Sequence, residues 1–291
     1  MPRDLRILVT GAGGQLGSAL AAARWAGVAE LAALPHGALD ITDEARVLET
    51  LAAIAPDLVV NAAAFNAVDR AEQEPHLAWA VNRDGPARLA AHCARSGASL
   101  IHFSSDYVFD GERDVPYRET DEPAPLGVYG QSKLQGEQAV AGALERHLIL
   151  RTSWVFGRDG DGFLHRILQT GTARGSLDMV ADQWSTPTPV AGLVALVAEV
   201  VRRLVAGDAV PWGLYHFAGS PPASRFTYTQ AIFEARSGAP VVLRPVVSAD
   251  FPAVARRPRY SALDSARAEA TFGVPSPSWR EALPAVVRAL A

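Results

Sequence analysis

The sequence predicts an α/β fold in which a doubly wound parallel sheet carries a smaller, interleaved lobe. Before Thr152, short β-prone apolar runs alternate with longer segments of helical periodicity, which is typical of a helix-covered parallel sheet. A glycine-rich turn follows the first apolar run. Beyond Thr152, glycine and proline become denser and the alternation loosens, which indicates a second unit of different construction.

The first part of the chain is expected to alternate strands with helices. We expect strands at 5–10, 30–34, 57–61, 99–104 and 147–152. We expect helices at 15–24, from a cap at Thr42 to residue 54, at 75–96 with Pro75 in the first turn, and within 127–143.

The first strand ends in a turn that is typical of dinucleotide-binding sites. Its glycines follow a GxxGxxG spacing through Gly11, Gly14 and Gly17. In such a turn the first glycine permits the bend, the second admits a pyrophosphate and the third packs the helix on the strand. Gln15 and Leu16 open that helix, whose free N–H groups would face the phosphates. The predicted sheet domain is therefore of the Rossmann type.

The second unit is predicted to be interleaved with the first. Strand-like segments at 177–181, 214–218 and 241–247 lie between helical ones, and the apolar helical segment 190–205 is expected to pack back on the sheet. The predicted dinucleotide-binding domain is thus 1–155, with 188–206 packing on it. The predicted substrate-binding lobe comprises 156–187 and 207–291.

Composition restricts the partners. The net charge is −4 with acids and bases mixed, so no basic stripe is available for nucleic acid. The longest apolar stretch is too short to span a bilayer, and no apolar leader precedes the first strand. The histidines and the single cysteine, Cys93, lack metal-ligand spacing, so no metal site is expected. We expect a soluble cytoplasmic protein, either a monomer or a weak homodimer.

The end of the second predicted strand leaves the choice between NADPH and NADH open. An acid that binds the ribose 2′-hydroxyl is expected there, but the chain has Leu-Pro-His at 34–36, with no arginine beside it. Asp40 and Ile41 are placed to contact the adenine end. Asp40 could equally be a turn residue before Thr42.

Two further segments are expected beside the cofactor. Ala62, Ala63 and Ala64 follow Asn61 at the end of the third predicted strand, where small side chains let the backbone pass close to a ribose. Asn82 could anchor the backbone of the active site, or it could be an ordinary helix asparagine.

Tyr129 and Lys133 form a YxxxK pair that predicts proton-transfer chemistry. Their i, i+4 spacing puts both on one helix face. The ammonium is expected to bring the tyrosine pKa towards neutrality and to hold the nicotinamide ribose. Ser105 ends the fourth predicted strand, at the sheet edge where such folds bind ligands, and could polarise a carbonyl beside Tyr129. The three residues predict a nicotinamide-dependent oxidoreductase.

Six motifs, at 61–72, 104–111, 128–133, 150–157, 182–188 and 255–261, extend along the chain. Together they resemble the dTDP-4-dehydrorhamnose reductase family of the extended short-chain dehydrogenase/reductase superfamily. The motifs in the second lobe make the resemblance specific to this family.

The resemblance implies reduction of dTDP-6-deoxy-L-lyxo-4-hexulose to dTDP-L-rhamnose, usually with NADPH. Tyr129 would donate the proton to the developing alkoxide, and Ser105 would bond the same oxygen. The residues implied to contact the sugar are Val68, Asp69, Ser105, Asp106, Tyr107, Tyr129 and Trp154. Arg256 and Arg257 would approach the diphosphate. The alternatives are a packed core aromatic for Trp154 and a solvated surface pair for the arginines.

Three departures from the family pattern stand out. Ser185 replaces the glycine of an Asp-Gln-x-Gly-x-Pro-Thr motif, so the local backbone could differ. The first helix lacks the glutamate that some members use to bind magnesium between subunits. The Leu-Pro-His at 34–36 does not select a cofactor.

Rival functions remain at this stage. A dehydratase would need a glutamate after Asp106, where the chain has Tyr107. A reductase of another nucleotide-4-keto-6-deoxy sugar is possible, because small pocket differences decide the sugar. A non-catalytic regulator is also possible, since the regulatory β subunit of methionine adenosyltransferase resembles the same family.

Overall fold

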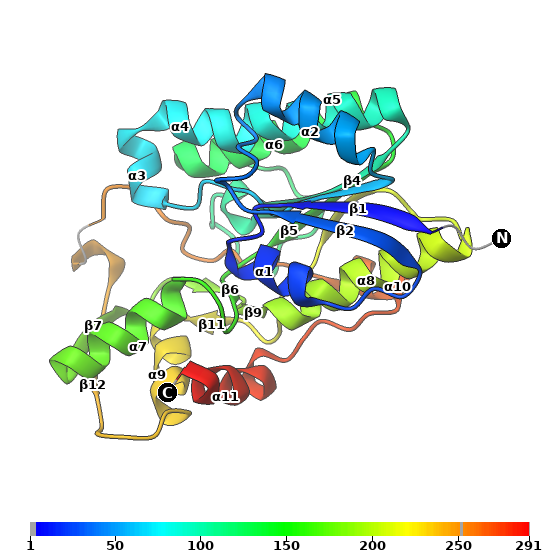
Figure 1. Cartoon of the computed structure of the whole chain (residues 1–291). Helices are drawn as coiled ribbons and strands as arrows, with labels where there is room; N and C mark the ends of the chain where they lie inside the picture. The colour runs from blue at the N-terminus through cyan, green and yellow to red at the C-terminus, as the bar shows by residue number, and fades with distance from the viewer. Residues whose placement is uncertain (1–3, 251–252, 291) are drawn as a thin grey trace.

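A computed structural model describes residues 4–250 and 253–290, and a six-stranded parallel sheet lies at its centre (Figure 1). The strand order is β10-β5-β4-β3-β1-β2, so the order reverses beside β1 as in a doubly wound sheet. The strands are β1 (Leu5–Thr10), β2 (Val28–Leu34), β3 (Leu58–Asn61), β4 (Ser99–Ser105), β5 (His147–Thr152) and β10 (Gly213–His216). The predicted fold class is confirmed.

Helices cover both faces of the sheet (Figure 1). One face carries α2 (Glu44–Ile54), α5 (Gly85–Ser96) and α6 (Val128–Ala143); the other carries α1 (Gln15–Ala22), α8 (Val190–Ala206) and α10 (Ala266–Phe272). Because side chains alternate along a strand, Leu8 of β1 packs in the first layer while Ile7 packs in the second. The expected return of the 190–205 helix to the sheet is confirmed.

Two predicted helix boundaries were wrong. Asp43, not Thr42, caps α2, because its carboxylate accepts from the Arg46 N–H at 3.0 Å while the Thr42 hydroxyl bonds Asp40. The single helix expected at 75–96 is divided into α4 (Pro75–Trp79), a π-helical turn η1 (Ala80–Asp84) and α5. The π turn contains Asn82, whose side chain leaves the helix to bond other segments.

The strand expected at 214–218 was assigned to the wrong unit. It is β10, which extends the large sheet by pairing Leu214 with Ile149 of β5. Tyr215 then packs edge-on against Phe272 of α10, with ring centroids 5.1 Å apart. The sequence of a four-residue strand does not indicate which sheet it joins. Here the pairing is determined by the open edge of β5, to which β10 adds.

The smaller lobe is built around Tyr228 and Trp279, whose rings meet edge-on at 5.5 Å. Its helices are α7 (Phe163–Arg174), α9 (Arg225–Glu234) and α11 (Trp279–Leu290). Its strands pair as β7 (Ser176–Val180) with β12 (Val242–Val246), β8 (Trp184–Ser185) with β11 (Ala223–Ser224), and β6 (Val155–Phe156) with β9 (Thr188–Pro189). Three short helices complete the chain: α3 (Val68–Gln73) and the 3-10 turns η2 (Asp106–Val108) and η3 (Ser248–Asp250).

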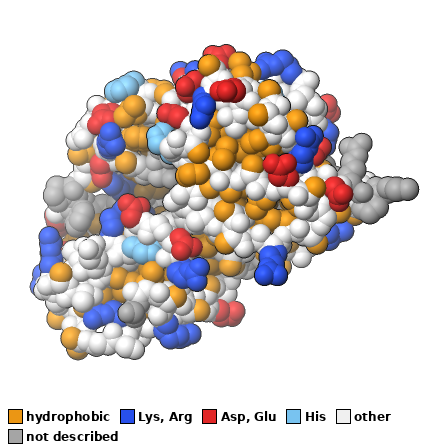
Figure 2. All heavy atoms as spheres, in the orientation of Figure 1, with side chains coloured by type: hydrophobic (Ala, Val, Ile, Leu, Met, Phe, Trp, Pro, Cys, Tyr) orange, Lys and Arg blue, Asp and Glu red, His pale blue; other side chains and the backbone are white. Residues whose placement is uncertain are grey.

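Acidic and basic side chains are interspersed on the face drawn in Figure 2. Within 4–250 and 253–290, no helix combines the length and the apolar character needed to cross a membrane.

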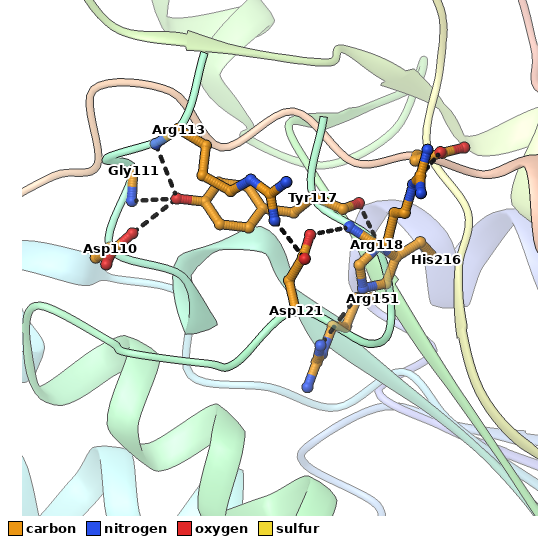
Figure 3. Close-up of polar contacts among 9 residues, drawn as sticks. Asp110, Gly111, Arg113, Tyr117, Arg118, Asp121, Arg151 and His216 are labelled. Atoms are coloured by element: carbon orange, nitrogen blue, oxygen red, sulfur yellow. Dashed lines mark hydrogen bonds and ion pairs between the residues drawn. The ribbon is translucent and has the colours of Figure 1, made fainter. Parts of the chain in front are cut away.

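A buried polar network of Arg151, His216 and Glu137 joins β5, β10 and α6, and Figure 3 shows Arg151 and His216 beside Tyr117. Arg151 forms a two-point ion pair with Glu137, at 2.9 and 2.7 Å. His216 is fully buried; its Nδ1 lies 2.9 Å from the Tyr117 carbonyl and its Nε2 lies 3.4 Å from Arg151. A neutral ring with its hydrogen on Nδ1 satisfies both contacts. Burial lowers the pKa of His216 to about 3, with Arg151 adding to the effect.

The buried His216 should make stability depend on pH. The unfolded chain protonates this histidine below about pH 6.5, whereas the folded chain resists until about pH 3. The free energy of unfolding should therefore fall as the pH drops through this window. In denaturant titrations at about pH 7 and about pH 5, His216→Gln should lose less stability on acidification than the wild type. His76→Gln, at an exposed histidine, should keep the wild-type dependence. Equal pH slopes for His216→Gln and wild type would contradict this account.

Candidate active site

The glycine turn and the alanine run meet at the carboxyl ends of β1 and β3. Gly11 has a φ of +68°, and a Cβ there would lie 2.5 Å from the Ala63 nitrogen. A Cβ on Gly17 would lie 2.1 Å from the Gly11 carbonyl oxygen. Packing within the chain therefore requires glycine at both positions.

Gly14 differs from the other two glycines. A Cβ there would have no neighbour nearer than 3.5 Å, and its φ of −86° suits any residue. Within the described part of the chain no side chain caps the first turn of α1, so its N–H groups remain available. This uncapped, uncrowded turn fits a dinucleotide, because an anion can approach the backbone at Gly14.

The other residues predicted to bind cofactor use their side chains within the chain. The Gln15 amide donates to the Val155 carbonyl at 3.4 Å, and Leu16 packs against the core beneath the sheet. Asp40 accepts from the Thr42 N–H at 2.9 Å and from its hydroxyl at 2.8 Å. Ile41 is buried. The structure thus gives Asp40 the turn role that the sequence left as an alternative.

Asn82 fixes the segment that follows β3. Its side-chain oxygen accepts from the Phe65 N–H at 2.9 Å, and its amide donates to the Phe65 carbonyl and the Ser132 hydroxyl, each at 3.0 Å. Ser132 in turn donates to the Tyr129 carbonyl at 2.8 Å. Asn82 is therefore the backbone anchor that the sequence suggested, and it links the residues after Ala64 to α6.

Helix α6 lies unusually close to the turn that follows β4. A Cβ on Gly130 would be 2.1 Å from the Tyr107 carbonyl oxygen, so only glycine allows this approach. Glu72 of α3 accepts from the Val128 N–H at 2.8 Å and holds the helix start. These contacts place Tyr129 beside the end of β4.

Ser105, Tyr129 and Lys133 converge at the end of β4 and are all buried. The Tyr129 ring meets the Tyr107 ring edge-on at 5.6 Å. The Tyr129 hydroxyl donates to the Asn66 side-chain oxygen at 3.3 Å, and the Lys133 ammonium donates to the Phe103 carbonyl at 2.5 Å. The tyrosine and lysine thus lie on the helix face that the sequence predicted, beside the strand-end serine.

One electrostatic expectation was wrong. Burial raises the pKa of Tyr129 above its ordinary value, and the nearby Ser105 hydroxyl opposes this only in part. Burial lowers the pKa of Lys133 to about 8, against the opposing charge of Glu137. The lysine does not shift the tyrosine pKa here, because its ammonium is drawn to the Phe103 carbonyl. Tyr129 is therefore a neutral phenol that carries its proton at neutral pH.

The second lobe brings two arginines, Arg256 and Arg257, close to Tyr129 and Asp69. Arg257 forms a two-point ion pair with Asp69, at 2.7 and 3.1 Å, and this bond lowers the pKa of Asp69. Arg256 lines a small cleft together with Val68, Tyr107 and Tyr129. Asp69 and Arg257, expected to contact different parts of the substrate, instead bind each other.

Trp154 adopts a strained backbone, with a φ of +41°. The Arg225 guanidinium lies 3.6 Å from the centre of its ring and 4.6 Å from that of Phe163. Trp154 also packs against Tyr228 at 6.2 Å, so it is partly a core residue, as the alternative interpretation held.

Sequence reasoning missed several residues of this site. Arg225 starts α9, far from any motif, and no spacing signals it. Asn66 and Glu72 lie inside the 61–72 motif, but their partners are 63 and 56 residues away. Only the packing of α3 on α6 reveals those two.

Comparisons with known proteins agree with this geometry. The model of the RmlD substrate binding domain family matches residues 5–291. The dTDP-4-dehydrorhamnose reductase of Sinorhizobium fredii is 39% identical over 290 residues, covering 98% of both chains. The chain belongs to this family.

Further members of the reductase family match at similar levels. The Mycobacterium tuberculosis reductase is 42% identical and covers 97% of this chain and 92% of its own. The crystal structure of the Bacillus anthracis reductase in complex with NADP has a TM-score of 0.90 and 32% identity, over 97% of this chain and 98% of that chain.

The glycines of this family member should respond differently to alanine. Gly17→Ala forces a Cβ into backbone and should lower the free energy of unfolding by about 1–3 kcal/mol. Gly14→Ala should leave it unchanged or raise it by up to about 1 kcal/mol, because the backbone tolerates alanine. Urea denaturation of the two variants measures the difference. Equal destabilisation would show that Gly14 is also required by packing.

Proposed function

We propose that this chain reduces the C4 ketone of dTDP-6-deoxy-L-lyxo-4-hexulose to give dTDP-L-rhamnose, with NADPH as the reductant. The observation that most strongly supports this proposal is the convergence of Ser105, Tyr129 and Lys133 beside an uncapped glycine turn. It occurs in a chain 37–42% identical, over most of its length, to curated dTDP-4-dehydrorhamnose reductases.

NADPH supplies a hydride from its nicotinamide when bound. Gly11, Gly14 and Gly17 and the first N–H groups of α1 would hold its pyrophosphate, since a ligand can approach the backbone there. The 62–64 backbone, Tyr129 and Lys133 would lie along the nicotinamide ribose. No carboxylate follows β2 at 35–36, so nothing at that point repels a 2′-phosphate.

Tyr129 is the proposed proton donor. Burial keeps its phenol neutral, so Tyr129 would carry the proton that the developing C4 alkoxide takes. The Ser105 oxygen, whose hydrogen is donated to Asp106, would accept from the Tyr129 phenol and orient it towards the substrate. Lys133, whose ammonium donates to the Phe103 carbonyl, would hold the nicotinamide ribose beside Tyr129.

Residues of both lobes would position the substrate. Val68, Tyr107 and Arg256 line the cleft beside Tyr129 and are placed to meet the sugar and its diphosphate. Arg257 can contact phosphate with the guanidinium edge not used by Asp69. Trp154, held by Arg225, would close the sugar side.

We also infer that the protein is a monomer or weak homodimer and that it is cytoplasmic. A magnesium bridge between subunits is not expected, because residues 17–20 of α1 are Gly-Ser-Ala-Leu and include no carboxylate.

The purified protein should oxidise NADPH only when a dTDP-4-keto-6-deoxy sugar is present. Tyr129→Phe should lower kcat by about 10²–10⁴-fold, because the proton donor is lost, while NADPH still binds. Tyr215→Phe is the control, since the Pro211 carbonyl is the only partner of that hydroxyl among the described residues. An assay across nucleotide keto-sugars, with NADH in parallel, identifies substrate and cofactor. Full turnover by Tyr129→Phe would refute the mechanism, and an inactive wild type that binds a synthetase would favour the regulator.

Gly14→Ala should separate cofactor binding from folding. A methyl group on the open side of the turn would obstruct the pyrophosphate, so the Kd for NADPH should rise at least about tenfold while stability holds. Fluorescence titration with NADPH measures this, and wild-type affinity in the variant would place the pyrophosphate elsewhere.

A further inference from the structure

Asp106 is a buried carboxylate at the junction of three chain segments. Only 2% of its surface is exposed. It accepts hydrogen bonds from Ser105 at 3.1 Å, from Ser185 of β8 at 2.8 Å and from Ser261 at 2.5 Å. The three serines are buried as well. The end of β4 and two segments of the smaller lobe therefore meet on one carboxylate.

The hydrogen positions follow from the donors available. A serine hydroxyl has one hydrogen and an ionised carboxylate has none, so all three serines donate to Asp106. Ser185 and Ser261 occupy Oδ2, and Ser105 occupies Oδ1. The Ser105 oxygen also accepts from the Tyr107 N–H at 3.1 Å. These two contacts leave the Ser105 oxygen one further lone pair.

This arrangement conflicts with direct sugar binding by Asp106. Both of its oxygens already accept from serines, and the carboxylate is enclosed. The serines leave one lone pair, on Oδ1, and a sugar hydroxyl would have to reach it on a carboxylate that is only 2% exposed. The contacts instead suit a group that acts through Ser105.

We propose that Asp106 is a positioning residue: its ionised carboxylate, held by Ser185 and Ser261, sets the direction of the Ser105 hydroxyl beside Tyr129. This role rests on the proposed reductase function. Ser185 and Ser261 belong to the smaller lobe, and Trp184 bonds the 259–261 segment through the Ser261 N–H at 2.8 Å. The docking of that lobe and the orientation of the catalytic serine are thus coupled through one carboxylate.

The two outer serines favour the ionised form of Asp106. Burial raises the pKa of Asp106, and the hydrogen bonds from Ser261, Ser185 and Ser105 oppose that rise. The charged and titratable groups around it are Arg225 of α9, which also favours the ionised form, Tyr107 of η2 and Tyr129 of α6. Losing one serine donor removes a charge-assisted bond and favours the protonated acid.

Ser185→Ala and Ser261→Ala test the proposal through the pH profile of kcat. The acid limb should move up by about one pH unit in each variant, so the loss of kcat should be at least about fivefold at the acid end and should shrink as the pH rises. NADPH affinity should stay at the wild-type value. Ser99→Ala is the matched control, because Ser99 is equally buried at the opposite end of β4 and its hydroxyl has no partner among the described residues.

A second readout does not depend on turnover. In carbon-13 NMR of aspartate carboxyl groups, the Asp106 resonance is the one lost in Asp106→Asn, and its titration midpoint should be higher in Ser185→Ala than in the wild type. If the wild type reduces no keto-sugar, the proposed function fails, and this midpoint alone decides whether the serines hold Asp106. An unmoved midpoint overturns the proposal. So does a Ser185→Ala pH profile that matches that of Ser99→Ala.

Discussion

The close approach of α6 to the turn after β4 is the contact on which the candidate active site depends. A side chain at position 130 would collide with the Tyr107 carbonyl, so glycine there allows the helix to bring Tyr129 to the strand end. Lys133 then reaches the carbonyl of Phe103, which lies two residues before Ser105 on β4. Asn82 holds the other side of α6 through Ser132. Backbone contacts at this helix, more than any single side-chain interaction, create the arrangement.

The sheet supplies the second half of the site because parallel strands end at one edge. Gly11 and Ala63 are in backbone contact there, so the turn after β1 and the segment after β3 form one continuous surface. Gly11 and Gly17 are needed to build that surface, whereas Gly14 is spared any packing duty. This division of roles explains why one glycine in three is expected to affect ligand binding without affecting the fold.

Three charged side chains around the site are held by partners within the chain before substrate arrives. Arg257 is paired with Asp69, Arg225 is stacked on Trp154, and Asp106 is surrounded by serine hydroxyls. Each pairing joins segments from different lobes or different layers. Pre-formed pairs of this kind hold side chains in position at little further entropic cost when a ligand binds. Ser185, a departure from the family pattern in sequence, becomes a structural donor to Asp106.

The sequence by itself determined most strands, the glycine turn, the Tyr129–Lys133 pair and the family, because these depend on local periodicity and short spacings. It misplaced the cap of α2, where Thr42 and Asp43 compete as neighbours, and it missed the π turn, because Asn82 bonds Phe65 and Ser132 in other segments. Tertiary structure alone decided that β10 joins the large sheet and that Asp69 binds Arg257, 188 residues away. It also decided that two distant serines meet Asp106. Such contacts form only when separate lobes dock, so no local pattern encodes them.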